Sequence, residues 1–96
     1  MIRHIVMFKF RPGVAEDQRR EAVRKLAELG TKVPEIREWS VGAHIDTGRK
    51  AWDMVQVSGF EDFAALDRYR VHPEHVSVRD LLAQVADWAV VDYEFG

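Results

Sequence analysis

Hydrophobic and polar residues recur with two different periods along the chain, and each change of period predicts a change between strand and helix. Residues 2–10 are rich in β-branched and aromatic side chains and stop at Pro12-Gly13, which is typical of a strand followed by a turn. In residues 15–29 the apolar positions fall three and four apart, acidic residues occupy the first turn, and Gly30 follows at the position where glycine commonly ends helices. The chain therefore begins with a strand and a helix.

The middle and the end of the chain predict three more strands and a broken helix. Residues 36–45 and 52–58 have the composition of strands, joined by a turn at residues 46–49. Residues 61–71 predict a second helix, which ends or bends at His72 because Pro73 disfavours helical geometry at the residue before it. The remaining predicted elements are a helix from Pro73 to about residue 85 and a strand over residues 88–95.

This order of elements predicts an α+β, ferredoxin-like βαββαβ fold. Right-handed crossovers place the helices on one face of a four-stranded antiparallel sheet and leave its other face open. Because side chains alternate between the two faces of a strand, one set turns toward the helices: His4, Val6, Phe8, Phe10, Trp52, Met54, Gln56, Trp88, Val90 and Asp92. The other set occupies the open face: Ile5, Met7, Val55, Val57, Val91, Tyr93 and Phe95.

The open face predicts a homodimer. An apolar patch of this size exceeds what monomeric soluble proteins normally expose, and hiding apolar surface contributes about 25 cal/mol per Å². The predicted elements include no further helix that could cover the patch. A twofold dimer that packs sheet face against sheet face would bury it, and a monomer with a partly wetted sheet is the alternative.

Composition narrows the class of protein. The chain has 96 residues, 47% hydrophobic and 31% charged, which predicts one globular domain over residues 1–96. Fourteen Lys and Arg residues against sixteen Asp and Glu residues give a net charge of −2, which argues against a nucleic-acid partner. No segment approaches the ~20 apolar residues of a membrane span, and none resembles a signal peptide, so we expect a cytoplasmic protein without a membrane partner. The absence of cysteine excludes thiolate chemistry and cysteine-based metal sites.

Residues 69–76, Tyr-Arg-Val-His-Pro-Glu-His-Val, concentrate the candidate catalytic groups. Tyr69 and His72 lie at the end of one predicted helix, and His75 lies in the first turn of the next, where the helix dipole disfavours a charged imidazole. A neutral imidazole near pH 7 is suited to act as a general base. Asp92 interrupts an apolar strand and is the candidate partner that orients His75, while Tyr69 would bind a substrate oxygen.

Structural roles are the alternatives for these same residues. His72 is also placed to cap the second helical segment, and His75 with Asp92 to form a purely structural pair. Tyr69 and His4 could both serve only to fill the core. A metal site built from the histidines and acids lacks a diagnostic spacing such as HExxH, so we expect no metal.

Three segments carry a resemblance to a known family. They are the opening IRHIVMFKF of residues 2–10, the central Tyr69-x-x-His72-Pro73-x-His75-Val76, and the closing Asp92-Tyr93. Together they resemble the stress-responsive A/B barrel (Dabb) family over essentially the whole chain, which implies a dimeric α/β barrel of ferredoxin-like protomers. The best-understood relatives, polyketide cyclases of the olivetolic acid cyclase type, close a ring without metal or cofactor.

The resemblance also implies roles for individual residues. The residue that matches His75 is the general base of such cyclases, the one that matches Asp92 orients it, and the one that matches Tyr69 helps to hold the substrate. The implied ligand-binding residues of a pocket between sheet and helices are His4, Val6, Phe8, Val23, Leu26, Met54, His72 and Val76. Met54 stands where the cyclase has a pocket histidine, and Ala22 and Val23 stand where it has large aromatic residues, so a different substrate is expected.

The leading functional hypothesis is a cofactor-free cyclase or lyase that acts on a polyketide-like carbonyl compound with a His75–Asp92 general base. One alternative is a non-catalytic homodimer that binds small molecules or is associated with stress. Another is a cofactor-free monooxygenase of the antibiotic-biosynthesis type. A closed, fully packed space around His75 would argue against any substrate there.

Overall fold

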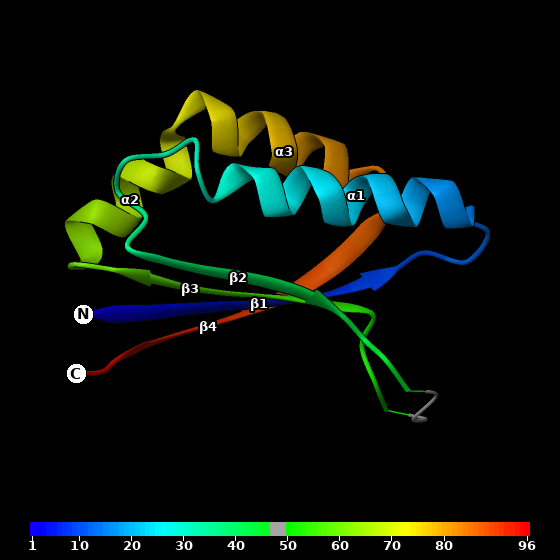
Figure 1. Ribbon diagram of the computed structural model, residues 1–96, viewed down its shortest axis with the longest axis horizontal. Helices are drawn as coiled ribbons and strands as arrows, with labels where there is room; N and C mark the ends of the chain where they lie inside the picture. Colours follow the sequence, from blue (N-terminus) through cyan, green and yellow to red (C-terminus); the bar gives the residue numbers. More distant parts are fainter. Residues whose placement is uncertain (47–49) are drawn as a thin grey trace.

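The computed structural model describes residues 1–46 and 50–96, which form one sheet with helices packed on it (Figure 1). The strands are β1 (Ile2–Phe10), β2 (Glu38–Ala43), β3 (Met54–Phe60) and β4 (Ala86–Glu94), and the helices are α1 (Glu16–Leu29), α2 (Phe63–Val71) and α3 (Pro73–Ala83). The order confirms the predicted βαββαβ fold with a broken second helix. The ends of the elements agree with the prediction to within two residues, and most of the predicted turn at residues 46–49 lies outside the described residues.

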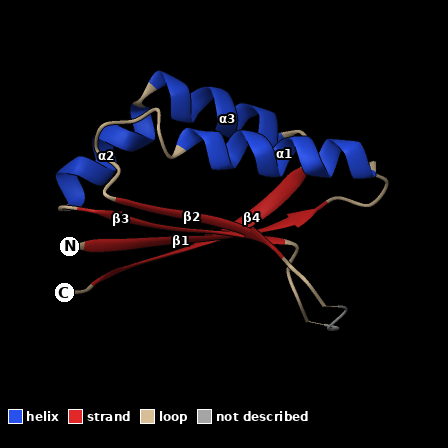
Figure 2. Ribbon diagram, viewed as in Figure 1, coloured by secondary structure: helices blue, strands red, loops and turns tan. Residues whose placement is uncertain are grey.

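The four strands pair antiparallel in the order β2-β3-β1-β4, so that β1 and β3 are central and β2 and β4 are the edges. Figure 2 shows α1, α2 and α3 on one face of this sheet, and no helix of the described residues covers the other face. The layer arrangement expected for a ferredoxin-like fold is therefore present. No helix in the described part of the chain is long and apolar enough to cross a membrane.

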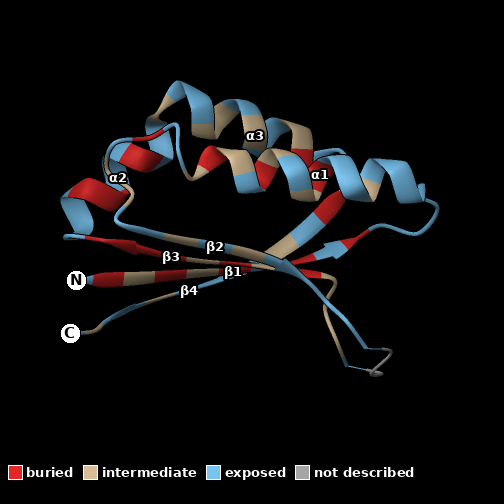
Figure 3. Ribbon diagram, viewed as in Figure 1, coloured by how far each residue is buried: buried red, intermediate tan, exposed pale blue. Residues whose placement is uncertain are grey.

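The core lies between the sheet and the helices (Figure 3). Burial alternates along β1 as predicted, with residues 2, 4, 6, 8 and 10 buried beneath the helices and the residues between them more accessible. The helices contribute the opposite side of the core through Ala22, Leu26, Leu29, Ala65, Leu66, Tyr69 and Leu82. On the edge strand β4 the alternation of burial is weaker. Val90 faces the helical side there and is still 46% exposed.

The open face of the sheet carries the apolar patch that alternation predicts. Met7, Val91 and Tyr93 are 40%, 60% and 47% exposed, and the remaining predicted members of the patch are half-buried. Part of that burial comes from Arg3, whose guanidinium lies 3.8 Å from the centre of the Phe95 ring. The protomer thus presents a continuous apolar sheet surface that its own helices do not cover.

Gly30 ends α1 for a reason that the sequence did not indicate. Its backbone has φ −58° and ψ −22°, a conformation open to every residue, and not the left-handed geometry of the common glycine cap. A Cβ atom at Gly30 would lie within 3.0 Å of three atoms of the Trp39 indole. Glycine at this position therefore makes room for Trp39 of β2, which packs against the core from the sheet edge.

Candidate functional site

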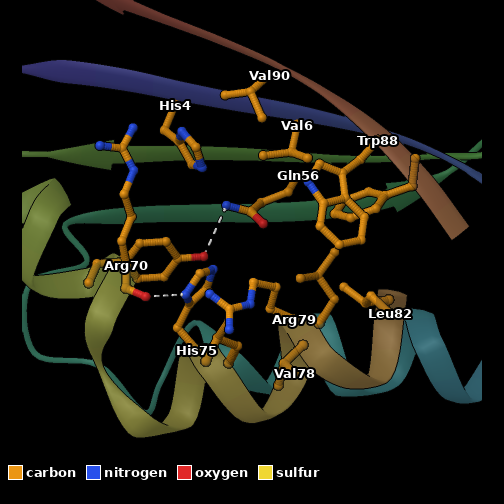
Figure 4. A pocket seen from close by; sticks show the side chains of 14 residues that line it. His4, Val6, Gln56, Arg70, His75, Val78, Arg79, Leu82, Trp88 and Val90 are labelled. Carbon is orange, nitrogen blue, oxygen red and sulfur yellow. Dashed lines mark hydrogen bonds between the residues drawn. The ribbon is translucent and has the colours of Figure 1, made fainter. Parts of the chain in front are cut away.

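A cavity of about 260 Å³ lies between the sheet and the helices and is partly open to solvent (Figure 4). Its polar lining consists of His4, Gln56, Tyr69, Arg70, His75 and Arg79, and its apolar lining includes Val6, Phe8, Leu26, Leu82 and Trp88. The volume falls just below the range of about 300–1,000 Å³ typical of drug-sized sites. The space beside His75 is therefore not closed and packed, and it suits a small molecule.

The cavity contains some of the residues that the sequence singled out and leaves out others. His75, Tyr69, His4, Val6, Phe8 and Leu26 line it, whereas Asp92, Val23, Met54, His72 and Val76 do not. Met54 is buried in the core, and Val23 packs against that core from α1. The predicted face of β1 thus lines the cavity, whereas the predicted positions on α1 at Val23, on β3 at Met54 and on α3 at Val76 do not line it.

The break between α2 and α3 places His75. His72 has an extended backbone with ψ 134°, so α2 ends there and α3 begins at Pro73, whose fixed φ suits the first helical position. The His72 Nδ1 accepts a hydrogen bond of 3.1 Å from the backbone N–H of Glu74. His72 therefore caps α3, the structural role that the sequence left as an alternative, and His75 projects from the first turn into the cavity.

A hydrogen bond to the backbone fixes the tautomer of His75. Its Nδ1 lies 2.8 Å from the carbonyl oxygen of Arg70, and because a carbonyl only accepts, Nδ1 must carry the hydrogen. The neutral ring then has its lone pair on Nε2, which turns toward the cavity in Figure 4. His75 thus presents a proton acceptor, not a donor, to any molecule in the cavity.

The surroundings of His75 also favour its neutral form. Burial is the largest cause that lowers the pKa of His75, and the nearby charges of Arg79, His4 and Arg70 lower it further, while the hydrogen bond to the Arg70 carbonyl opposes them. The helix dipole predicts a neutral imidazole at this position. The structure supports the expectation but assigns it mainly to the loss of water around the ring.

The predicted pairing of His75 with Asp92 is wrong. The Asp92 carboxylate binds Nδ1 of His4 through Oδ1 and accepts a hydrogen bond of 3.1 Å from Nη2 of Arg70 through Oδ2. His4 is the register partner of Asp92 across β1 and β4, and the Nδ1 of His75 is already engaged by the Arg70 carbonyl. Asp92 therefore orients His4 and Arg70 and lies behind the cavity wall.

A chain of buried hydrogen bonds sets the direction of the Tyr69 hydroxyl. The Ser58 hydroxyl donates to the His4 carbonyl at 3.0 Å, so its oxygen must accept from the Gln56 amide nitrogen at 3.1 Å. The same nitrogen donates to the Tyr69 oxygen at 3.5 Å. The Tyr69 hydrogen is then available to a ligand, and burial raises the pKa of Tyr69, so the hydroxyl stays protonated.

Sequence reasoning did not assign a function to Gln56, Arg70 or Arg79. Gln56 carried a usable signal, because an amide on the helix-facing side of an apolar strand needs a buried partner. Nothing in the local sequence distinguishes the two arginines, and only the tertiary structure brings them to the cavity. In residues 1–46 and 50–96 no group of three or more histidine and acidic side chains is placed to hold a metal ion.

Comparison with known proteins gives consistent matches along the whole chain. A family model described as the stress-responsive A/B barrel domain matches residues 2–95. An uncharacterised protein of Streptomyces coelicolor is 36% identical over 97 residues, which cover 99% of this chain and 100% of that protein.

Solved structures share the fold. A dimeric ferredoxin-like protein of unknown function from Bacteroides fragilis has a TM-score of 0.85 and 31% identity, covering 98% of this chain and 95% of that one. A hydroxynitrile lyase from Passiflora edulis has the same TM-score at 17% identity, covering 99% and 93% of the two chains. The second likeness is one of fold alone.

Proposed function

The chain belongs to the stress-responsive A/B barrel (Dabb) family, and from this premise we propose that it is a small-molecule enzyme that uses His75 as a general base on a carbonyl compound. The observation that carries the proposal is the Nδ1–H···O=C bond from His75 to Arg70, which leaves Nε2 as an acceptor facing the cavity. A neutral imidazole whose lone pair faces the substrate is suited to proton abstraction near pH 7.

The proposed chemistry needs no redox partner. His75 Nε2 takes a proton from the carbon next to a carbonyl, and the electron pair of the broken C–H bond moves onto the carbonyl oxygen. The Tyr69 hydroxyl donates a hydrogen bond to that oxygen, which stabilises the developing negative charge. The enolate carbon then bonds to a second carbonyl carbon, and the proton on His75 passes to the new alkoxide.

Two reaction directions use the same base. Ring closure of a polyketide-like compound forms a carbon–carbon bond. In a lyase reaction His75 removes a hydroxyl proton, the alkoxide becomes a carbonyl as the adjacent carbon–carbon bond breaks, and the leaving carbanion takes the proton from His75. The solved structure from Passiflora edulis is named a hydroxynitrile lyase, so the lyase direction stands beside cyclisation as a candidate. In both reactions Asp92 is a positioning residue, because it holds the side chains of His4 and Arg70 in place.

We also propose that the active unit is a homodimer through the open sheet face. The apolar patch at Met7, Val91 and Tyr93 is the surface that such a dimer would bury. The Bacteroides fragilis protein, similar to this chain over nearly its full length, is described as dimeric.

The test of the general base is deuterium exchange at the carbon next to a carbonyl. Butyrophenone in D₂O serves as the probe, and proton NMR follows the loss of its α-hydrogen signal. We expect the wild-type protein to accelerate exchange and His75→Gln to lose at least about 100-fold of that acceleration, the usual contribution of a general base. His44→Gln changes an exposed histidine outside the cavity and should match wild type. Equal rates for His75→Gln and wild type would contradict the proposal.

A further inference from the structure

We propose that the molecule bound in this cavity is an amphipathic carboxylate, whose acid group binds Arg79 and whose alkyl or aryl tail lies against Trp88 and Leu82. The inference rests on the proposed function, because it names the substrate class of that same site. Its support comes from the placement of Arg79, the charges that line the cavity and the division of the lining into polar and apolar ends.

Arg79 stands beside the base. It follows His75 by four residues on α3, so both side chains lie on one face of the helix, one turn apart. Both line the cavity, and Figure 4 shows the guanidinium next to the imidazole. A carboxylate bound to Arg79 would therefore hold the rest of its molecule within reach of Nε2.

The hydrogen-bonding capacity of Arg79 is largely unused. Its Nε and Nη2 reach one oxygen of the neighbouring Asp80, at 3.3 and 3.2 Å, and no residue in the described part of the chain pairs with Nη1. The Asp80 side chain is 66% exposed and does not line the cavity, and such surface pairs are weak. A planar guanidinium in this state suits a carboxylate ligand, which it can bind through two parallel hydrogen bonds.

The charged groups that line the cavity are all cationic or able to become so. They are His4, Arg70, His75 and Arg79, and no aspartate or glutamate among the described residues lines it. Arg70 pairs with two carboxylates, those of Asp67 and Asp92, and neither of them lines the cavity. The pKa of His75 responds to these charges, because Arg79, His4 and Arg70 all lower it. An anion in the cavity would relieve that repulsion and make His75 a stronger base.

The other end of the cavity has no charge. Figure 4 shows Trp88 and Leu82 at the end away from His4 and Arg70. Phe8 stacks at a tilt on Trp88, with ring centres 5.8 Å apart, and completes an aromatic wall. Burying a chain of methylene groups against this wall favours binding, because it removes apolar surface from water. The site as a whole therefore matches a molecule with one anionic and one apolar end.

The test compares two probes of the same shape, hexanoate and hexanamide, by calorimetry and by the NMR signal of the His75 ring. Wild-type protein should bind hexanoate at least about 10-fold more tightly than hexanamide, as expected for a hydrogen-bonded ion pair. Hexanoate should also raise the pKa of His75. Arg79→Gln should abolish both effects, and Arg79→Lys should keep part of the preference because it keeps the charge. Arg20→Gln removes an exposed charge from α1 and should behave as wild type.

Each outcome separates this inference from the proposed general base. Equal binding of the two probes to wild type, or no response of His75 to either, would overturn the anionic substrate class, whatever the exchange assay shows. A hexanoate preference that survives Arg79→Gln would overturn the role of Arg79. An Arg79-dependent preference together with equal deuterium exchange in wild type and His75→Gln would support the anion site and contradict catalysis by His75.

Discussion

His4 and Asp92 lie directly opposite each other in the register of β1 and β4, although 88 residues separate them in the chain. The Nδ1 of His4 binds one carboxylate oxygen, and Arg70 binds the other at 3.1 Å. The Asp92 side chain is only 20% exposed. The half-buried carboxylate of Asp92 on β4 therefore links β4 to β1 and to α2 at the polar end of the cavity.

Replacing Asp92 should weaken this junction. Asp92→Asn removes the charge that two hydrogen-bond partners share, and we expect a loss of about 1–3 kcal/mol in the free energy of unfolding, measured by urea titration. Asp67→Asn is the matched control, because Asp67 pairs with the same arginine from a position 70% exposed. The control should cost no more than about 1 kcal/mol. Equal losses in the two variants would refute the structural importance of the His4–Asp92 contact.

The stability of the protein should depend on pH through His75. Burial lowers the pKa of this group below its ordinary 6.5, so the unfolded chain binds the proton first as the pH falls. Between pH 6.5 and the lower folded value the unfolded state carries more protons, and stability decreases with acidification. Urea titrations over this window should show a smaller decrease in His75→Gln than in wild type. A pKa at or above 6.5 for His75 by NMR would contradict the prediction.

The contact between Gly30 and Trp39 predicts a large effect from one methyl group. Gly30→Ala would place Cβ within 3.0 Å of the indole, and we expect a loss of about 1–3 kcal/mol from the forced repacking. Gly42→Ala on β2 is the control, since a Cβ there has no neighbour within 4 Å. Thermal unfolding of both variants measures the difference. A stable Gly30→Ala protein would mean that Trp39 can move aside at little cost.

The proposed dimer predicts opposite results for two exposed valines. Val91→Asp puts a charge in the middle of the open sheet face and should shift sedimentation toward the mass of a single chain. Val71→Asp alters a valine that is 75% exposed on α2 and should leave the dimer intact. Both side chains are accessible in the protomer, so neither change should unfold it. A wild-type protein that sediments as one chain at micromolar concentration would overturn the dimer.

Several features of the fold and site could be predicted because they depend on local sequence. The alternation along β1 identified the buried side that carries His4, Val6 and Phe8, and Pro73 identified the break that brings His75 to the cavity. The pairing of Asp92 could not be predicted in this way. The topology brings both His4 and His75 near Asp92, and only the register of β1 and β4 selects His4 as its partner.

The sequence by itself determined the order of the elements, the two faces of the sheet and the position of the break between α2 and α3. Hydrophobic periodicity and the geometry of proline act over a few neighbouring residues, so they can be recognised in the sequence. The tertiary structure alone decided that Asp92 binds His4, that Arg70 and Arg79 line the cavity, and that Gly30 is required by Trp39. These contacts join residues far apart in the chain or depend on how a helix face is turned toward the sheet. Their geometry is set by packing and strand register, which no local pattern encodes.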